Sequence, residues 1–155
     1  MISQKPGWHF LYPPGTSATI GADGLPIISF FSLLCNDLRV AHCNTSTCNG
    51  STVSTVDSTT TAVGLYNSIT IGGDGLPVIS YLDVTNNSVH VAHCSNAECT
   101  TVLIYAPINP TNDVTSTSIT AGADGLPVVT YTETTGQLSI LKCASAFCTN
   151  YFSRR

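Results

Sequence analysis

Short apolar stretches separated by polar turns run along the whole chain and predict β-strands. In the first third of the sequence we expect strands at Ala18–Ile20, Pro26–Phe31, Leu38–Cys43 and Thr52–Val56. Within Leu38–Cys43, and again within Val89–Cys94, apolar and polar positions alternate, which predicts strands with one face in water. β-Branched residues dominate these stretches and a 3.6-residue periodicity is absent, so no helix is expected.

The whole set of strands recurs at an interval of about 50 residues, which marks a repeat architecture. The turn Gly-x-Asp-Gly-Leu-Pro occurs three times, at Gly21–Pro26, Gly72–Pro77 and Gly122–Pro127. The second set of strands is expected at Ser68–Ile71, Pro77–Leu82, Val89–Cys94 and Thr101–Tyr105, and the third at Ser118–Thr120, Pro127–Thr132, Leu138–Cys143 and Tyr151–Phe152. Four short antiparallel strands in a repeat of this length are typical of a β-propeller blade.

The predicted fold is therefore all-β and β-propeller-like, with three four-stranded antiparallel blades at residues 17–66, 67–116 and 117–155. An extra N-terminal strand is expected within residues 1–16, where Trp8, Phe10 and Tyr12 alternate with other residues. This strand would complete a blade or be donated to a neighbouring chain. Propellers close with roughly four to eight blades, so three leave faces and edges uncovered. We expect copies of the chain to self-assemble into a closed ring or a filament.

The repeated Asp-Gly pairs are expected in hairpin turns, because Asp and Gly accept the positive φ of a tight primed turn. The residues concerned are Asp23, Gly24, Asp74, Gly75, Asp124 and Gly125. An aspartate that hydrogen-bonds within its own turn explains all three carboxylates. A calcium site would need several oxygens from one loop, and each of these loops offers a single carboxylate.

Six of the seven cysteines form pairs separated by five residues, one pair in each repeat. The pairs are Cys43 and Cys48, Cys94 and Cys99, and Cys143 and Cys148. This spacing places both thiols across one hairpin and predicts three local disulfides. A zinc site that includes His42 or His93 is the alternative, although Lys142 takes that position in the third repeat. We expect no metal and no cofactor.

Cys35 has no counterpart in the other repeats, since Asn86 stands at its place in the second. We expect a buried free thiol there, and an intermolecular bridge is the alternative.

Charged residues make up only 9% of the chain, and five Lys and Arg leave a formal net charge of -4. This composition provides no basic stripe for nucleic acid. Apolar runs are too short for a membrane helix. The cysteines favour an extracellular or cell-surface location, whereas the N-terminal residues lack the apolar core of an export signal. We therefore expect a mature or excised piece, with sequons in surface loops at Asn44, Asn49 and Asn86.

The run Gly72–Thr100, which contains GGDGLPVISY, then VAHC, then CT, resembles repeats found in tandem in large secreted or surface proteins of bacteria. The resemblance extends over about Ser17 to Thr149. It departs at the extra Cys35, at Asn49 after the second cysteine of the first repeat, and at Lys142. It implies a β-propeller and a surface location, and it implies no defined chemistry.

No arrangement of nucleophile, base and acid stands out, because the histidines lie in predicted strands and no Gly-x-Ser-x-Gly elbow occurs. Phe30, Tyr81 and Tyr131 share one repeat position. Packing between blades is expected for them, and stacking on sugars is the alternative. The sequence thus favours a non-catalytic surface protein that self-assembles. The alternatives are a lectin-like module that binds glycans or proteins with one weak site per blade, and a glycoside hydrolase or sialidase-like propeller.

Overall fold

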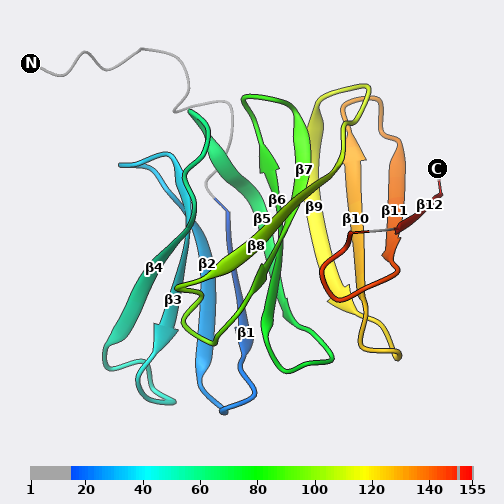
Figure 1. The fold of residues 1–155 in the computed structure, drawn as a ribbon. Helices are drawn as coiled ribbons and strands as arrows, with labels where there is room; N and C mark the ends of the chain where they lie inside the picture. Colours follow the sequence, from blue (N-terminus) through cyan, green and yellow to red (C-terminus); the bar gives the residue numbers. More distant parts are fainter. Residues whose placement is uncertain (1–14, 150, 155) are drawn as a thin grey trace, which may run out of the picture.

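The computed structural model describes residues 15–149 and 151–154, and this part of the chain consists of strands and connections without a helix (Figure 1). The twelve strands are β1 (Thr16–Ile20), β2 (Pro26–Ser32), β3 (Asp37–Cys43), β4 (Ser51–Asp57), β5 (Val63–Ile71), β6 (Pro77–Asp83), β7 (Ser88–Cys94), β8 (Val102–Ile108), β9 (Val114–Ala121), β10 (Pro127–Glu133), β11 (Leu138–Cys143) and β12 (Tyr151–Arg154). The expected N-terminal strand with Trp8, Phe10 and Tyr12 lies outside the described residues.

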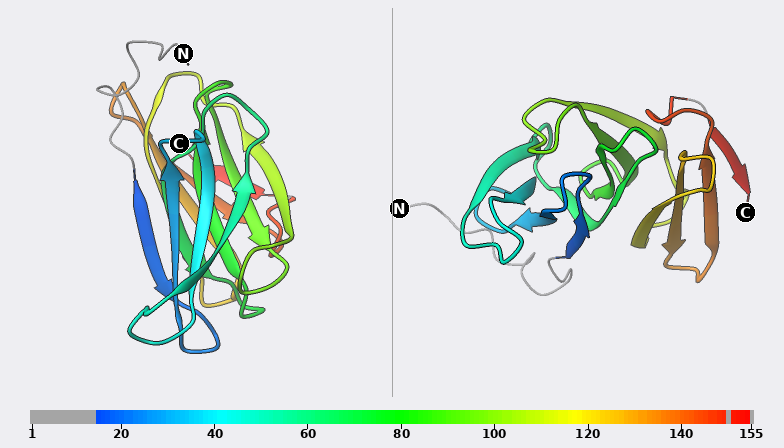
Figure 2. Two further views of the ribbon diagram at one scale, coloured as in Figure 1. Left: turned by 90° about the vertical axis from the view of Figure 1, so that its left-hand side faces the viewer. Right: turned by 90° about the horizontal axis from the view of Figure 1, so that it is seen from below.

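Three four-stranded sheets are formed, each from strands that follow one another along the chain and pair antiparallel. The first sheet contains β1–β4, the second β5–β8 and the third β9–β12. The sheets stand side by side in chain order, and the row is open, with the first and third sheets at opposite ends (Figures 1 and 2). The second and third sheets begin at Val63 and Val114, a few residues before the repeat boundaries expected from the sequence.

The β1–β2 hairpin, like its two counterparts, closes through a glycine in the left-handed region. Gly24 has a φ of 80°, and its N–H donates to the Gly21 carbonyl at 2.9 Å. Asp23 does not have a positive φ. The hairpin was predicted correctly, but the expectation of a primed turn with positive φ at both residues was wrong. The longer loop lets a single left-handed glycine reverse the chain.

The hydrophobic core consists of two clusters, each between neighbouring sheets. Between the first and second sheets lie Ile27, Leu38, Val40, Val56, Val63, Ile69, Ile79, Tyr81, Ala92, Cys94 and Cys99. Between the second and third sheets lie Leu65, Val78, Leu82, Val89, Val91, Ile108, Val114, Ile119, Val129, Tyr131, Leu141, Cys143 and Cys148. The second sheet is therefore covered on both faces.

Every residue of β6 and β7 is buried as a consequence. The alternation of Val89 and Val91 with His90 predicted a strand with one wet face, and this was wrong for β7. The reason is that the first sheet covers the face that carries His90, while the third covers the face that carries the valines.

Candidate functional site

The aspartate of each repeated turn accepts a hydrogen bond from a backbone N–H of that turn. Oδ1 of Asp23 accepts from the Leu25 N–H at 3.0 Å. The same bond joins Asp74 to Leu76 and Asp124 to Leu126, at 3.1 Å in both cases. These carboxylates thus stabilise their own turns, as the sequence suggested.

The carboxylates also bind a side chain from the third strand of their own sheet, which sequence reasoning missed. Nε2 of His42 lies 2.8 Å from Oδ2 of Asp23, and His93 and Asp74 are joined at the same distance. The Leu25 N–H, with the His42 ring, holds the pKa of Asp23 below its usual range.

In the third sheet Lys142 takes the place of the histidine and donates to Oδ1 of Asp124 at 2.7 Å. Lys142 is the main cause of the lowered pKa of Asp124. The sequence contained a signal for this pairing. The third strand of each repeat carries a His or a Lys at the position that faces the aspartate of its own turn. The cysteines that the zinc alternative needs as thiolate ligands are paired in disulfides, and the described residues contain no cluster of metal-binding side chains.

The three predicted disulfides are formed, with Cα–Cα distances of 4.7–4.9 Å. They differ in their surroundings. Cys99 and Cys148 are buried because each packs against the preceding sheet, whereas Cys48 is exposed because no sheet of the described residues precedes the first.

Cys35 is a free and exposed thiol, so the expectation that it is buried was wrong. It lies in the turn between β2 and β3, beside Leu34, whose side chain is 97% exposed. Arg39 donates from Nη2 to the Cys35 Sγ at 3.1 Å and forms an ion pair with Asp37 at 3.0 Å. The other residues of this turn are exposed as well, so packing does not cover the thiol.

The three aromatic residues at one repeat position have different environments. Tyr81 and Tyr131 are buried between sheets, whereas Phe30 is partly exposed on the first sheet. Packing between sheets thus accounts for the two tyrosines, and neither is available to stack on a sugar.

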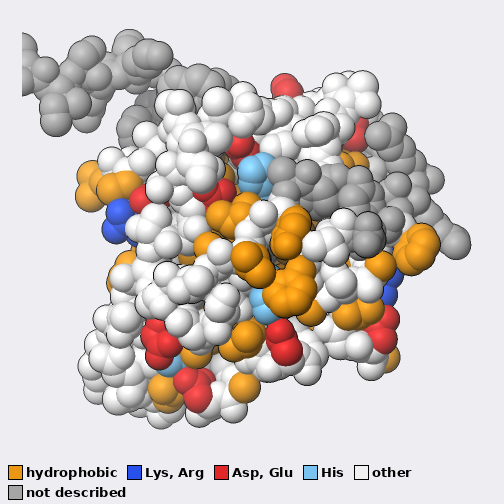
Figure 3. All heavy atoms as spheres, viewed as in Figure 1, with side chains coloured by type: hydrophobic (Ala, Val, Ile, Leu, Met, Phe, Trp, Pro, Cys, Tyr) orange, Lys and Arg blue, Asp and Glu red, His pale blue; other side chains and the backbone are white. Residues whose placement is uncertain are grey.

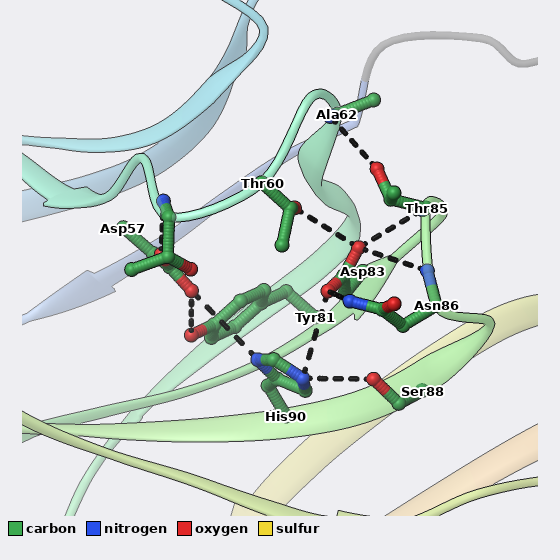
Figure 4. A network of polar contacts seen from close by, with 10 residues as sticks. Asp57, Thr60, Ala62, Tyr81, Asp83, Thr85, Asn86, Ser88 and His90 are labelled. Atoms are coloured by element: carbon green, nitrogen blue, oxygen red, sulfur yellow. Dashed lines mark hydrogen bonds and ion pairs between the residues drawn. The ribbon is translucent and has the colours of Figure 1, made fainter.

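A buried polar network joins the first and second sheets (Figure 4). The Tyr81 hydroxyl on β6 donates to Oδ2 of Asp57 at the end of β4, at 2.8 Å. The His90 ring lies beside them, with Nδ1 3.7 Å from Asp57 Oδ2 and Nε2 4.0 Å from Asp83 Oδ2. Nε2 of His90 also lies 2.8 Å from the Ser88 hydroxyl.

The network shifts the pKa values of its members. Burial alone would raise the pKa of Asp57, but His90, Thr59 and Tyr81 outweigh it and lower this pKa to about 2. Burial and the Asp57 charge raise the pKa of Tyr81. Asp57, Asp83 and His90 are all buried. The network therefore holds two sheets together and does not present an acid or a base to solvent.

The two ends of the row carry sheet faces that no other sheet of the described residues covers. In the first two sheets the apolar pairs Leu38/Val40 and Val89/Val91 are fully buried by the next sheet. Their counterparts in the third sheet, Leu138 and Ile140, are 54% and 43% exposed. We call this surface the third-sheet open face; it contains Val128, Thr130, Leu138, Ile140 and Phe152.

The first sheet has a corresponding uncovered surface on its opposite side. Ile20 and Val53 are 59% and 51% exposed there, whereas their counterparts Ile71 and Ile104 pack against the core. We call this surface the first-sheet open face; it contains Ala18, Ile20, Ile28, Phe30 and Val53.

A third apolar surface lies along the outer edge of the middle sheet. Figure 3 shows hydrophobic side chains gathered over β8, where Leu103 is 46% exposed.

Comparison with protein families finds no match, and comparison with curated protein sequences finds none either. Several solved structures share the fold. A protein of unknown function from Dyadobacter fermentans matches 88% of this chain with a TM-score of 0.66 and 9% identity. An α-L-arabinanase from Penicillium chrysogenum, complexed with arabinobiose, matches 88% with a TM-score of 0.59 and 9% identity. A fucose lectin from Kordia zhangzhouensis, in complex with methyl-fucoside, matches 90% with a TM-score of 0.54 and 8% identity.

The chain spans 39% of the length of the Dyadobacter protein, 47% of the arabinanase and 97% of the lectin. At these identities the matches establish the all-β arrangement of sheets. The described residues contain no helix long and apolar enough to cross a membrane.

Proposed function

We propose that this chain is a non-catalytic extracellular structural module of β-propeller type, which self-assembles through its two open end faces. The observation that carries the proposal is the exposure of Leu138 and Ile140, whose counterparts in both other sheets are fully buried. Burial of apolar surface stabilises association by about 25 cal/mol per Å² before the costs of association are subtracted. The third-sheet open face has the same kind of apolar residues as the faces that are covered by the next sheet. It is therefore suited to pack against a further sheet.

Three further observations support this role. The sheets follow one another as propeller blades do, in an open row. The three disulfides suit an oxidising environment outside the cell. The carboxylates of the turns and of the buried network are bound by neighbouring groups, so we propose no catalytic role for them.

The test is the native mass of the full chain by light scattering over a range of concentrations, with negative-stain images of the same sample. A discrete assembly with a ring outline, or long polymers, is the expected result. A compact monomer at high concentration would show the proposal to be wrong.

A lectin-like role is the second candidate, favoured by the match to a fucose lectin along nearly its whole length. In this role the repeats supply weak glycan sites, and avidity comes from their number. A glycan array that includes fucosides tests it, with the folded state of the protein checked by circular dichroism. No binding by folded protein would exclude this candidate and leave the structural role unaffected.

A further inference from the structure

We propose that two copies of this chain join head to tail and close a ring of six sheets. The third-sheet open face of each copy packs on the first-sheet open face of the other, in the register that already repeats inside the chain. This inference rests on the proposed self-assembly and specifies its partner, its surfaces and its stoichiometry.

The two open faces match each other in their apolar residues. Inside the chain, Val89 and Val91 pack in one cluster with Val129 and Tyr131 of the next sheet. Leu138 and Ile140 present the same kind of surface at the end of the row. The counterparts of Val129 and Tyr131 in the first sheet are Ile28 and Phe30, which remain partly exposed.

A hydrogen bond repeats between the first strands of successive sheets. The Ile69 N–H donates to the Ser17 hydroxyl at 3.2 Å, and the Ile119 N–H donates to the Ser68 hydroxyl at the same distance. The next hydroxyl in this series is that of Ser118, which is exposed, whereas Ser17 and Ser68 are partly covered. In the ring its donor is the N–H of Ala18 in the second copy.

A second polar contact also repeats, from the second strand of one sheet to the first strand of the next. The Ser29 hydroxyl donates to Oδ1 of Asn67 at 2.7 Å, and the hydroxyls of Ser80 and Thr117 lie 3.0 Å apart. Continuation of this series pairs the hydroxyl of Thr130 with that of Thr16 in the second copy. Both faces therefore carry polar groups at the positions where the inner contacts require them.

The repeated turns also contact one another in series, and among the described residues the first turn has no preceding neighbour. A Cβ at Gly125 would lie 2.8 Å from Gly73 Cα, and one at Gly75 would lie 3.4 Å from the Ala22 Cβ, because successive turns contact each other. A Cβ at Gly24, in the first turn, would meet nothing within 4 Å. The open space beside Gly24 is where the last turn of a second copy fits.

The number of sheets determines the number of copies. Two copies supply six sheets, which lies within the roughly four to eight blades of closed propellers, whereas three copies would exceed that range. Each copy uses two different faces, and such a heterologous contact gives a ring when the rotation closes. A two-copy ring leaves no open sheet face.

The experiment is site-specific crosslinking of the full chain, in a Cys35→Ser background that removes the exposed thiol. Ala18→Cys and Ser118→Cys are made separately, mixed, and treated with a short bis-maleimide linker. The expected result is a crosslinked dimer in the mixture and none in either variant alone. A crosslink within one variant alone would mean that like faces meet, and would overturn the head-to-tail contact.

A chain that carries both substitutions tests the closure. Two crosslinks per ring give a species of twice the 16.2 kDa chain mass and nothing larger. A ladder of higher species would overturn the ring, because it requires an open filament.

Charged substitutions test whether the two open faces carry the assembly. Ile140→Lys and Val53→Lys each place a charge on one open face, at positions already exposed. Each is expected to reduce the native mass to that of one chain. The matched control is Leu103→Lys, at an exposed position on the middle sheet, which is expected to leave the mass unchanged. Wild-type assembly into polymers overturns the two-copy ring and leaves the proposed function in place. Wild-type assembly that resists both face variants, or a monomeric wild type, overturns the proposed function as well.

Discussion

Replacement of Tyr81 by phenylalanine isolates one bond of the buried network between the first two sheets. The substitution removes a hydroxyl that donates to Oδ2 of Asp57 at 2.8 Å, and it leaves the ring in place. A hydrogen bond to a charged group contributes about 1.5–3 kcal/mol, so we expect the free energy of unfolding to fall by about 2 kcal/mol. For a domain of this size that is a decrease of about 4–8 °C in Tm.

The pH dependence gives a second and more specific signature. The pKa of Asp57 is about 2 in the folded chain, below its ordinary value of 3.8. Because the folded pKa is the lower one, the ionised carboxylate stabilises the fold above pH 3.8, and this contribution is lost as the pH falls through 2. One pKa unit corresponds to about 1.4 kcal/mol, so the net contribution of this carboxylate is about 2 kcal/mol. The difference between wild type and Tyr81→Phe should therefore shrink in acid.

Urea unfolding followed by circular dichroism at several pH values measures both effects. Tyr131→Phe is the matched control, since Tyr131 occupies the same repeat position and Ile108 stands where Asp57 would be. The reasoning would be refuted by equal losses in the two variants, or by a Tyr81→Phe loss that does not depend on pH.

Three other outcomes follow from single contacts. Gly73→Ala places a Cβ 2.8 Å from Gly125 Cα, and the resulting overpacking should lower stability by about 1–3 kcal/mol in urea unfolding; an unchanged midpoint would contradict this contact. Cys35 should react with a thiol reagent in the native state, giving one reactive thiol per chain, whereas reaction only in denaturant would contradict its exposure. Lys142→Met should raise the pKa of Asp124 toward 3.8 in an NMR titration, and an unaltered titration would exclude the ion pair as the cause.

The strands and disulfides could be predicted from the sequence because their signals are local and occur three times. A turn such as Gly21–Pro26 or a cysteine pair five residues apart depends on neighbours in the chain and on little else. The pairing of His42 with Asp23 was also within reach, since the same separation of 19 residues recurs between Asp74 and His93. Alignment of the repeats by charge would have found it.

The remaining features depend on which sheet covers which, and the repeat pattern does not encode this. Burial of His90 requires the first sheet to lie on the second. The network around Asp57 has no equivalent between the second and third sheets, where Ile108 and Ser139 replace Asp57 and His90. A search for repeated residues therefore could not detect it. The exposure of Cys35 follows from its place in the turn between β2 and β3, and the aligned Asn86 is exposed in the matching turn of the second repeat.

The contacts between neighbouring sheets recur at the interval of the sequence repeat, so each repeat is one structural unit of the chain. Short connections at residues 58–62 and 109–113 join the sheets, and the serine contacts of the first strands recur from each sheet to the next. Removal or duplication of one complete repeat would thus preserve the serine contacts at every remaining junction. A cut inside a repeat would instead separate a disulfide or a strand from its partner. Changes in the length of such a protein are therefore tolerated in steps of one sheet, and each step changes how many copies are needed to complete a ring.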